Sequence, residues 1–170
     1  MKKIFIITVC LVLVMLYACN REENAVTDRN ETIRDTDITM DDISDFYYTE
    51  EFINFNASYT RYRFYKEEGR YMFFYETRER KDDYGPCTEE DRTSYGTAEI
   101  KESEWAEFFS YLKDGSVRNR KEDPEDGGSG PWLFIYTDKG PKEGQEYHFT
   151  DYGLLKGFEE YCAKLTDKYR

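Results

Sequence analysis

Histidine and cysteine, which supply most metal sites and many nucleophilic centres, are scarce in this sequence. It has one histidine, His148, and four cysteines in 170 residues. No closely spaced cysteine pair accompanies the histidine, so a zinc site has no ligand set. Gly-x-Ser-x-Gly and glycine-rich phosphate-binding motifs are missing as well. The sequence therefore predicts no metal, no cofactor and no nucleophilic catalysis, and we expect His148 to lie on the surface of a strand.

Positive charge is also scarce. Lys and Arg number 24 against 36 Asp and Glu, which gives a formal net charge of −12. Such a surface repels phosphate backbones and anionic lipid headgroups. The composition therefore disfavours nucleic-acid binding and the docking of basic residues on a membrane. Any attachment to a membrane has to come from something other than charge.

The only long apolar run is Ile4–Leu16, which follows two lysines near the start of the chain. It is too short to span a bilayer well, and its order of basic end, apolar stretch and small residue is that of an export signal. The segment Leu16–Cys19 (LYAC) closes the run. It resembles the lipobox of bacterial lipoproteins, with Tyr17 where a small or β-branched residue is usual. The resemblance implies cleavage of a signal peptide, residues 1–18, and lipidation of Cys19.

This resemblance to bacterial lipoproteins also implies a location. The mature chain would be held outside the cytoplasm, on the cell membrane or the outer membrane, by acyl chains that contribute roughly 0.8 kcal/mol per buried CH₂. The run Arg21–Glu23 is similar to the export signal of some surface lipoproteins. Loss of Met1–Ala18 removes two lysines and no acids, so the net charge falls to near −14. The body is similar to the small soluble domains of such proteins, with a Phe-Glu-rich terminal helix at Phe158–Tyr161.

The remainder of the chain divides into a tether and a domain. Residues 19–45 predict an acidic, flexible tether, because their apolar residues are isolated and no hydrophobic period is sustained. Residues 46–170 are enough for one domain with one core. Aromatic residues make up 18% of the chain, with 16 Tyr and 12 Phe. The apolar mass thus lies in few, large side chains, which is not typical of a disordered protein.

We expect an α+β domain with an antiparallel sheet of about five strands, two packed helices and the order β-β-β-α-β-β-α. Ile53–Tyr65 and Arg70–Arg80 are dense in aromatic and β-branched residues and flank a glycine, which is typical of a β-hairpin. A third strand is predicted at Thr93–Ile100. Trp132–Thr137 and Gln145–Thr150 predict a second hairpin.

Two apolar stripes with helical spacing predict the two helices. The first helix is expected to begin after Ser103 as its N-cap and to end before Gly115. The second is expected from Gly153 to about Lys168. Eight positions on the stripes are predicted to be buried: Trp105, Phe108, Phe109, Leu112, Leu155, Phe158, Cys162 and Leu165.

The cysteines and the acidic loops offer few chemical sites. Cys87 lies in a charged loop and Cys162 in the apolar stripe of the last helix. Whether these two form a disulfide depends on a geometry that the sequence does not contain. The acidic loop Lys121–Gly130 lacks the ligand spacing of an EF-hand, so we interpret it as solvated.

Tyrosine and arginine alternate along the first predicted strand. Exposed Tyr and Arg are typical of interaction hot spots and of platforms on which sugars stack. The alternative is that these rings belong to a core with a wet edge. The predicted binding surface consists of four residues on one face of the strand: Tyr59, Arg61, Arg63 and Tyr65.

We therefore interpret the chain as a lipid-anchored protein of the cell envelope, best described as a non-catalytic module that binds or scaffolds a protein or a glycan. Two alternatives stay open. One is a hydrolase that acts on envelope substrates through an Asp/Glu pair. The other is an inhibitor-like module that blocks a partner enzyme with its hairpin loops. Converging carboxylates in a cleft would favour the hydrolase.

Overall fold

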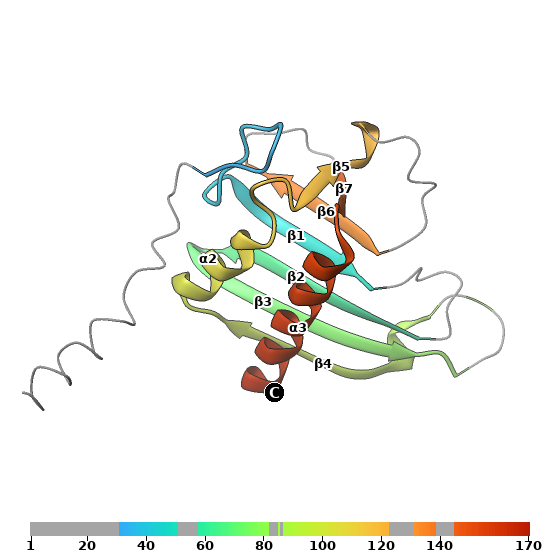
Figure 1. Ribbon diagram of the computed structural model, residues 1–170. Helices are drawn as coiled ribbons and strands as arrows, with labels where there is room; N and C mark the ends of the chain where they lie inside the picture. Colours follow the sequence, from blue (N-terminus) through green and yellow to red (C-terminus); the bar gives the residue numbers. More distant parts are fainter. Residues whose placement is uncertain (1–30, 51–57, 82–84, 86, 123–130, 139–144) are drawn as a thin grey trace, which may run out of the picture.

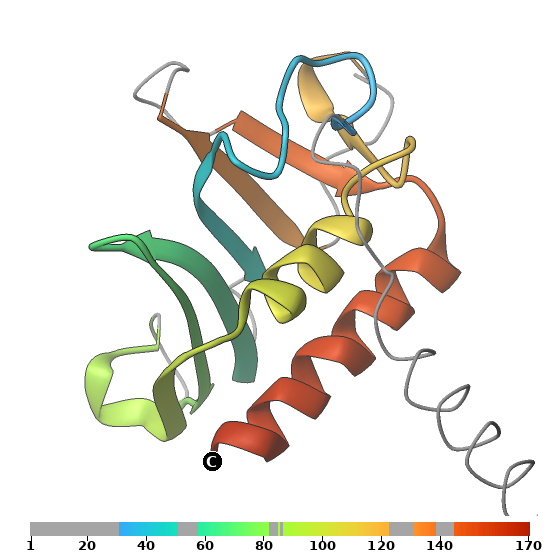
Figure 2. The ribbon, with the colours of Figure 1, turned by 90° about the vertical axis from the view of Figure 1, so that its left-hand side faces the viewer.

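The computed structural model describes residues 31–50, 58–81, 85, 87–122, 131–138 and 145–170. The predicted signal peptide, Cys19 and the first part of the predicted tether lie outside the described residues. Within these residues, seven strands form an antiparallel sheet, and both α-helices lie on the same face of it (Figures 1 and 2). The opposite face of the sheet, here called the open face, carries no helix of the described chain.

The strands follow one another in the sheet in the order β4-β3-β2-β1-β6-β7-β5. The strands are β1 (Ile43–Thr49), β2 (Ser58–Glu67), β3 (Arg70–Glu79), β4 (Arg92–Glu99), β5 (Val117–Asn119), β6 (Trp132–Thr137) and β7 (Gln145–Phe149). The helices are α2 (Glu102–Ser110) and α3 (Tyr152–Tyr169), with short 3-10 turns η1 (Glu89–Asp91) and η2 (Arg120–Glu122).

The first predicted hairpin is formed by β2 and β3. Glu68 and Gly69 lie between the strands with φ angles of 51° and 77°. Positive φ at both central residues is the signature of the type I′ turn, whose twist matches that of the flanking strands. This turn places Glu67 opposite Arg70, and the pairing continues without a shift to Ser58 and Glu79.

The expected α+β class is confirmed, but the sheet has seven strands rather than five. Strand β1 was missed because its register shifts between Ile43 and Asp45. The shift leaves Ile43 and Phe46 buried three residues apart, a spacing that resembles a helix more than a strand. Strand β5 was missed because it has three residues, of which only Val117 is apolar and buried. The order along the described chain is therefore β-β-β-β-α-β-β-β-α.

The domain also includes residues 31–45, which the sequence placed in the tether. Ile33 and Met40 are buried in the core together with Ile43. A backbone hydrogen bond of 2.9 Å from Ile33 N to Ile38 O closes a turn in this segment. Isolated apolar residues such as Ile33 and Met40 form no periodic pattern in the sequence, yet both pack in the core. The boundary of the folded domain therefore lies before residue 46.

Helices α2 and α3 agree closely with the predicted stripes. Seven of the eight predicted positions are buried, and Leu155 is partly buried against the core. Helix α2 begins two residues earlier than expected, so Lys101 rather than Ser103 precedes it. The side chain of Glu104 compensates by accepting a 2.8 Å hydrogen bond from the Lys101 backbone N–H.

Aromatic rings form the layer between the sheet and the helices. Phe64 of β2 stacks on Phe108 of α2 with ring centroids 4.1 Å apart, and it also contacts Phe158 of α3 at 6.3 Å. Phe46 of β1 meets the same two helical rings edge-on. The helices thus cover the sheet face to which these rings point. Of the helices in the described part of the chain, none has the length and apolar character needed to cross a membrane.

Candidate functional site

The open face carries the side chains that alternate with the core residues. On β2, Phe64 points to the helices, so Arg61 and Arg63 point to the open face, as the sequence predicted. The strand register brings Arg63 opposite Tyr47 of β1, and it brings Arg61 opposite Glu76 of β3. Two groups of side chains result, and three of the four predicted surface residues fall into them: Arg63 and Tyr65 into the first, and Arg61 into the second.

The first group, here called the Tyr–Arg patch, consists of Asp45, Tyr47, Arg63, Tyr65 and Tyr136. The guanidinium carbon of Arg63 lies 4.2 Å from the ring centroid of Tyr65 and 4.8 Å from that of Tyr47. Arg63 also donates two hydrogen bonds to Asp45, of 2.9 Å to Oδ1 and 2.6 Å to Oδ2. Tyr136 of β6 packs edge-on against Tyr47, with centroids 5.8 Å apart.

The Tyr–Arg patch is therefore ordered by its own contacts. Hydrogen bonding to Asp45 is the main reason that the pKa of Arg63 is raised. The bidentate pair fixes the guanidinium plane, and that plane supports the rings of Tyr47 and Tyr65. All five side chains are only partly buried. The result is a half-exposed aromatic surface whose rings lose little conformational freedom when a partner binds.

Tyr59 is not part of an exposed surface, so the prediction is wrong for this residue. Its ring is buried, and the guanidinium carbons of Arg61 and Arg78 lie 5.5 and 5.9 Å from its centroid. A tyrosine at the start of a strand can be covered by long side chains of its neighbours, which strand alternation alone does not show.

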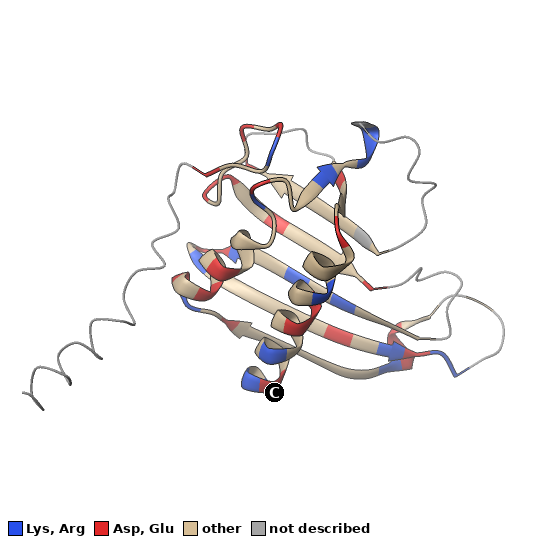
Figure 3. Ribbon diagram, in the orientation of Figure 1, with Lys and Arg blue, Asp and Glu red and all other residues tan. Residues whose placement is uncertain are grey.

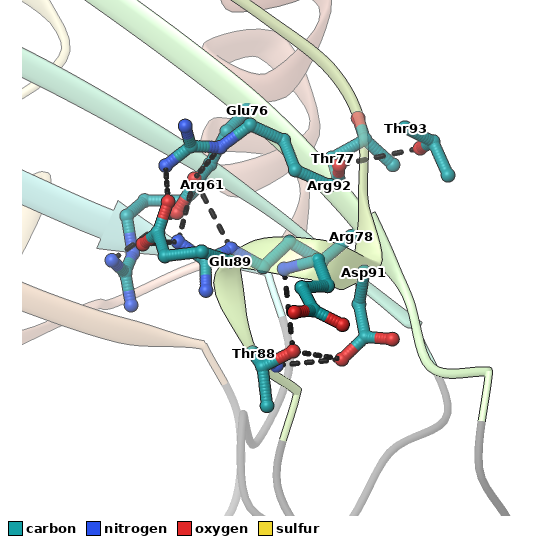
Figure 4. Close-up of polar contacts among 10 residues, drawn as sticks. Arg61, Glu76, Thr77, Arg78, Thr88, Glu89, Asp91, Arg92 and Thr93 are labelled. Atoms are coloured by element: carbon teal, nitrogen blue, oxygen red, sulfur yellow. Dashed lines mark hydrogen bonds and ion pairs between the residues drawn. The ribbon is translucent and has the colours of Figure 1, made fainter.

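The second group, here called the arginine cluster, consists of Arg61, Glu76, Arg78, Glu89 and Arg92 (Figure 4). Its centre is Glu76 of β3, whose side chain is 1% exposed. Arg78 donates to Glu76 Oε2 from Nε at 3.2 Å and from Nη2 at 3.0 Å. Arg92 Nε donates to the same oxygen at 3.1 Å, and Arg61 Nη1 lies 3.3 Å from Oε1. Figure 3 shows basic and acidic positions side by side where β3 ends and β4 begins.

Glu89 joins the arginine cluster from the solvent side. It opens the 3-10 turn η1, which is capped by reciprocal hydrogen bonds between Thr88 and Asp91. Its carboxylate accepts a 2.6 Å hydrogen bond from Arg78 Nη2 through Oε1, and Oε2 lies 2.5 Å from Arg92 Nη2. The hydrogen bond from Arg78 is the main reason that the pKa of Glu89 is lowered.

Two carboxylates converge here, but their chemistry is not that of a hydrolase. A glycosidase needs one carboxyl group with a raised pKa to act as general acid. The pKa of Glu89 is lowered instead, and Glu76 lies within 3.3 Å of three guanidinium groups. The arrangement is suited to holding charge rather than to transferring a proton.

The two cysteines of the domain are not bonded to each other in the described structure. Cys162 is fully buried on α3, and burial raises the pKa of its thiol well above the ordinary value. Such a thiol behaves as a small apolar side chain rather than as a nucleophile. Within the described residues, no group of three or more His, Cys, Asp or Glu side chains is placed to hold a metal ion.

Sequence reasoning missed Asp45 and Tyr47 of the Tyr–Arg patch because strand β1 was missed. It missed Tyr136 of the predicted strand β6 because β1 is the strand that brings β6 beside β2. It also missed the partners of Arg61 in the arginine cluster. The sequence could have predicted these partners, because a two-residue turn at Glu68 and Gly69 sets the register of the whole hairpin. Counting equal numbers of residues away from that turn places Arg61 opposite Glu76.

Comparison with known proteins gives no relative from which a function could be carried over. No protein-family model matches the chain, and neither a curated protein nor a solved structure matches it. Any functional proposal therefore rests on the two groups of side chains on the open face.

Proposed function

We propose that this chain is a lipid-anchored protein of the bacterial cell envelope and binds an envelope protein or glycan through the open face of its sheet. The observation that carries the proposal is the Tyr–Arg patch, where Arg63 is fixed between two half-exposed tyrosine rings. Tyrosine and arginine are among the residues enriched in binding hot spots. Their ordering before binding lowers the entropy that a partner has to offset.

The location rests on the lipobox-like segment Leu16–Cys19. A lipid on Cys19 would attach an acidic domain to a membrane that its charge does not favour. The open face would then be presented to proteins or glycans outside the membrane. Non-catalytic binding fits the arginine cluster as well, because its carboxylates are held by guanidinium groups rather than poised for proton transfer.

Substitution of the lipidation residue tests the location. Cys19→Ala should move the protein from the membrane fraction to the soluble fraction, since the acyl chains would supply the attachment. The measurement is fractionation combined with incorporation of a labelled fatty acid. Cys87→Ala, which changes a thiol within the domain, should leave both results unchanged. A Cys19→Ala protein that still sediments with membranes, together with an unlabelled wild type, would show that the lipoprotein assignment is wrong.

Substitution in the Tyr–Arg patch tests the binding surface. Tyr65→Ala should weaken capture of an envelope protein or glycan by about 2 kcal/mol, roughly thirtyfold, if the ring is a hot spot. Its thermal stability should change little, because the ring is only partly buried. Binding is measured by pull-down from envelope extracts and with purified envelope glycans.

The matched control for this test is Tyr152→Ala. Tyr152 is an exposed tyrosine at the start of α3 and therefore lies on the helical side of the domain. Its removal should leave capture unchanged. If Tyr65→Ala unfolds the domain, the ring belongs to the core and the surface proposal fails. Equal losses from Tyr65→Ala and Tyr152→Ala would also contradict a site on the open face.

A further inference from the structure

The arginine cluster has an inner and an outer side that differ in solvation. On the inner side, Glu76 is buried and accepts hydrogen bonds from Arg78 and Arg92. On the outer side, the carboxylate that the described structure places against their Nη2 atoms is that of Glu89. The Glu89 side chain is 70% exposed, whereas that of Arg78 is 9% exposed. An exposed carboxylate thus closes a largely buried guanidinium site.

Arg78 and Arg92 bind the carboxylate of Glu89 from two sides, and their two guanidinium groups are here called the clamp. Arg78 Nη2 lies 2.6 Å from one oxygen of Glu89, and Arg92 Nη2 lies 2.5 Å from the other. Two guanidinium groups therefore bridge one carboxylate, each holding one oxygen. Both arginines are held from behind by Glu76, so the clamp keeps its shape independently of Glu89. Any carboxylate of similar shape can satisfy the same two donors.

Charge favours an external anion at this position. The cluster contains three arginines and two glutamates, an excess of positive charge in a chain whose formal net charge is −12. When Glu89 rotates away, three guanidinium groups face one carboxylate. The ligand would take the place of Glu89 on the outer side, while the 9% exposed side chain of Arg78 keeps one of the two donors largely shielded from water.

An aromatic ring beside the clamp indicates what the anion is attached to. Tyr95 of β4 is 63% exposed, and the guanidinium carbon of Arg92 lies 4.6 Å from its ring centroid. Tyr95 pairs with Glu76 in the strand register, so both side chains point to the open face. An exposed ring next to a carboxylate clamp matches a uronic acid, which has a C–H face for stacking and a carboxylate at its edge.

The geometry points to a carboxylate-binding site in which Arg78 and Arg92 clamp the carboxylate of an acidic saccharide, Tyr95 stacks on its sugar ring, and Glu89 occupies the clamp when no ligand is bound. This inference rests on the proposed function, because it names a ligand class for the open face. It adds that Glu89 competes with the ligand. The affinity measured for the ligand is then the affinity of the open clamp multiplied by the fraction of molecules in which Glu89 does not fill it.

The test uses the full chain and two matched probes. Oligogalacturonate is the acidic probe, and its fully methyl-esterified form is the neutral one. Isothermal titration should show binding of the acid and not of the ester. Arg92→Gln should weaken binding of the acid by about 10- to 100-fold, the usual value of a hydrogen bond to a charged group. Glu89→Ala should strengthen it severalfold, because it removes the internal competitor.

A control variant separates competition from a general change of charge. Glu90→Ala removes the same charge from the same η1 turn, and Glu90 does not contact the clamp arginines in the described structure. Its affinity for oligogalacturonate should stay within about twofold of the wild type, since one exposed charge contributes little. Tightening by Glu89→Ala is also a result that a purely structural ion-pair network would not give. It remains measurable if Arg92→Gln fails to fold.

Three results would overturn the inference: equal binding of the acid and its ester, no tightening in Glu89→Ala, or equally tight binding of a short peptide through its terminal carboxylate. The two proposals fail separately. If oligogalacturonate does not bind while Tyr65→Ala still weakens partner capture, the clamp is wrong and the binding function stands. If the clamp variants behave as expected while Tyr65→Ala has no effect, the Tyr–Arg patch is wrong and the clamp stands.

Discussion

Replacement of Phe108 by alanine should lower the free energy of unfolding by about 3–5 kcal/mol. Phe108 lies on α2 and is fully buried. Its ring stacks on Phe64 at 4.1 Å and contacts Phe46 at 4.9 Å and Trp105 at 5.1 Å. Alanine would leave a cavity where the helix meets two strands, and the rigid rings around it cannot collapse to fill the space.

Urea unfolding followed by circular dichroism measures this loss. The matched control is Glu107→Ala, an exposed position on the same helix, which should change the stability by no more than about 0.5 kcal/mol. A loss below about 1 kcal/mol for Phe108→Ala would mean that α2 does not present this face to the sheet. The prediction therefore tests the helical phase that places the open face on the other side of the domain.

The helices were predictable because their signal is local. An apolar stripe with a period of 3.6 residues marks the buried face of a helix without knowledge of what it packs on. Phe158 and Leu165 of α3 are buried as the stripe requires. The first turn of α2 was less predictable, because Ser103 is a favourable N-cap residue, yet the helix begins after Lys101, whose backbone N–H donates to the side chain of Glu104.

Strand β1 was not predictable, because its signal depends on its neighbours. It lies at the centre of the sheet, between β2 and β6, and the register shift near Ile43 interrupts its alternation. Ile33 gives no periodic signal either, since it fills the core from a turn. Residues of this kind are buried by contacts distant in sequence, which a local pattern does not contain.

The binding surface was predictable only in part. Alternation places Arg63 and Tyr65 on the same strand face, and the structure brings them into contact. It does not reveal that Tyr59 is covered or that Asp45 holds the guanidinium group. A pattern along one strand states which way side chains point. The contacts that these side chains make depend on the strands on either side.

Removal of the negative charge at the centre of the arginine cluster should lower the free energy of unfolding nearly as much as the cavity left by Phe108→Ala. Glu76→Gln keeps the shape of the side chain but removes the carboxylate charge that Arg61, Arg78 and Arg92 share, and leaves the exposed Glu89 as the carboxylate partner of Arg78 and Arg92. Loss of one partner of a buried ion pair costs about 3–5 kcal/mol. We expect about 3 kcal/mol here, because Arg61 and Arg92 are about a quarter exposed and water can hydrate them.

Thermal and urea unfolding measure the effect, with Glu99→Gln as the control. Glu99 is an exposed glutamate of β4, 3.9 Å from Arg70, and an exposed pair of this kind contributes at most about 1 kcal/mol. Addition of Arg78→Met to Glu76→Gln should recover part of the loss, because Arg78 is the most buried of the three cations that lose their shared partner. If the two substitutions simply add, the charges are not coupled and Glu76 does not hold the clamp in place.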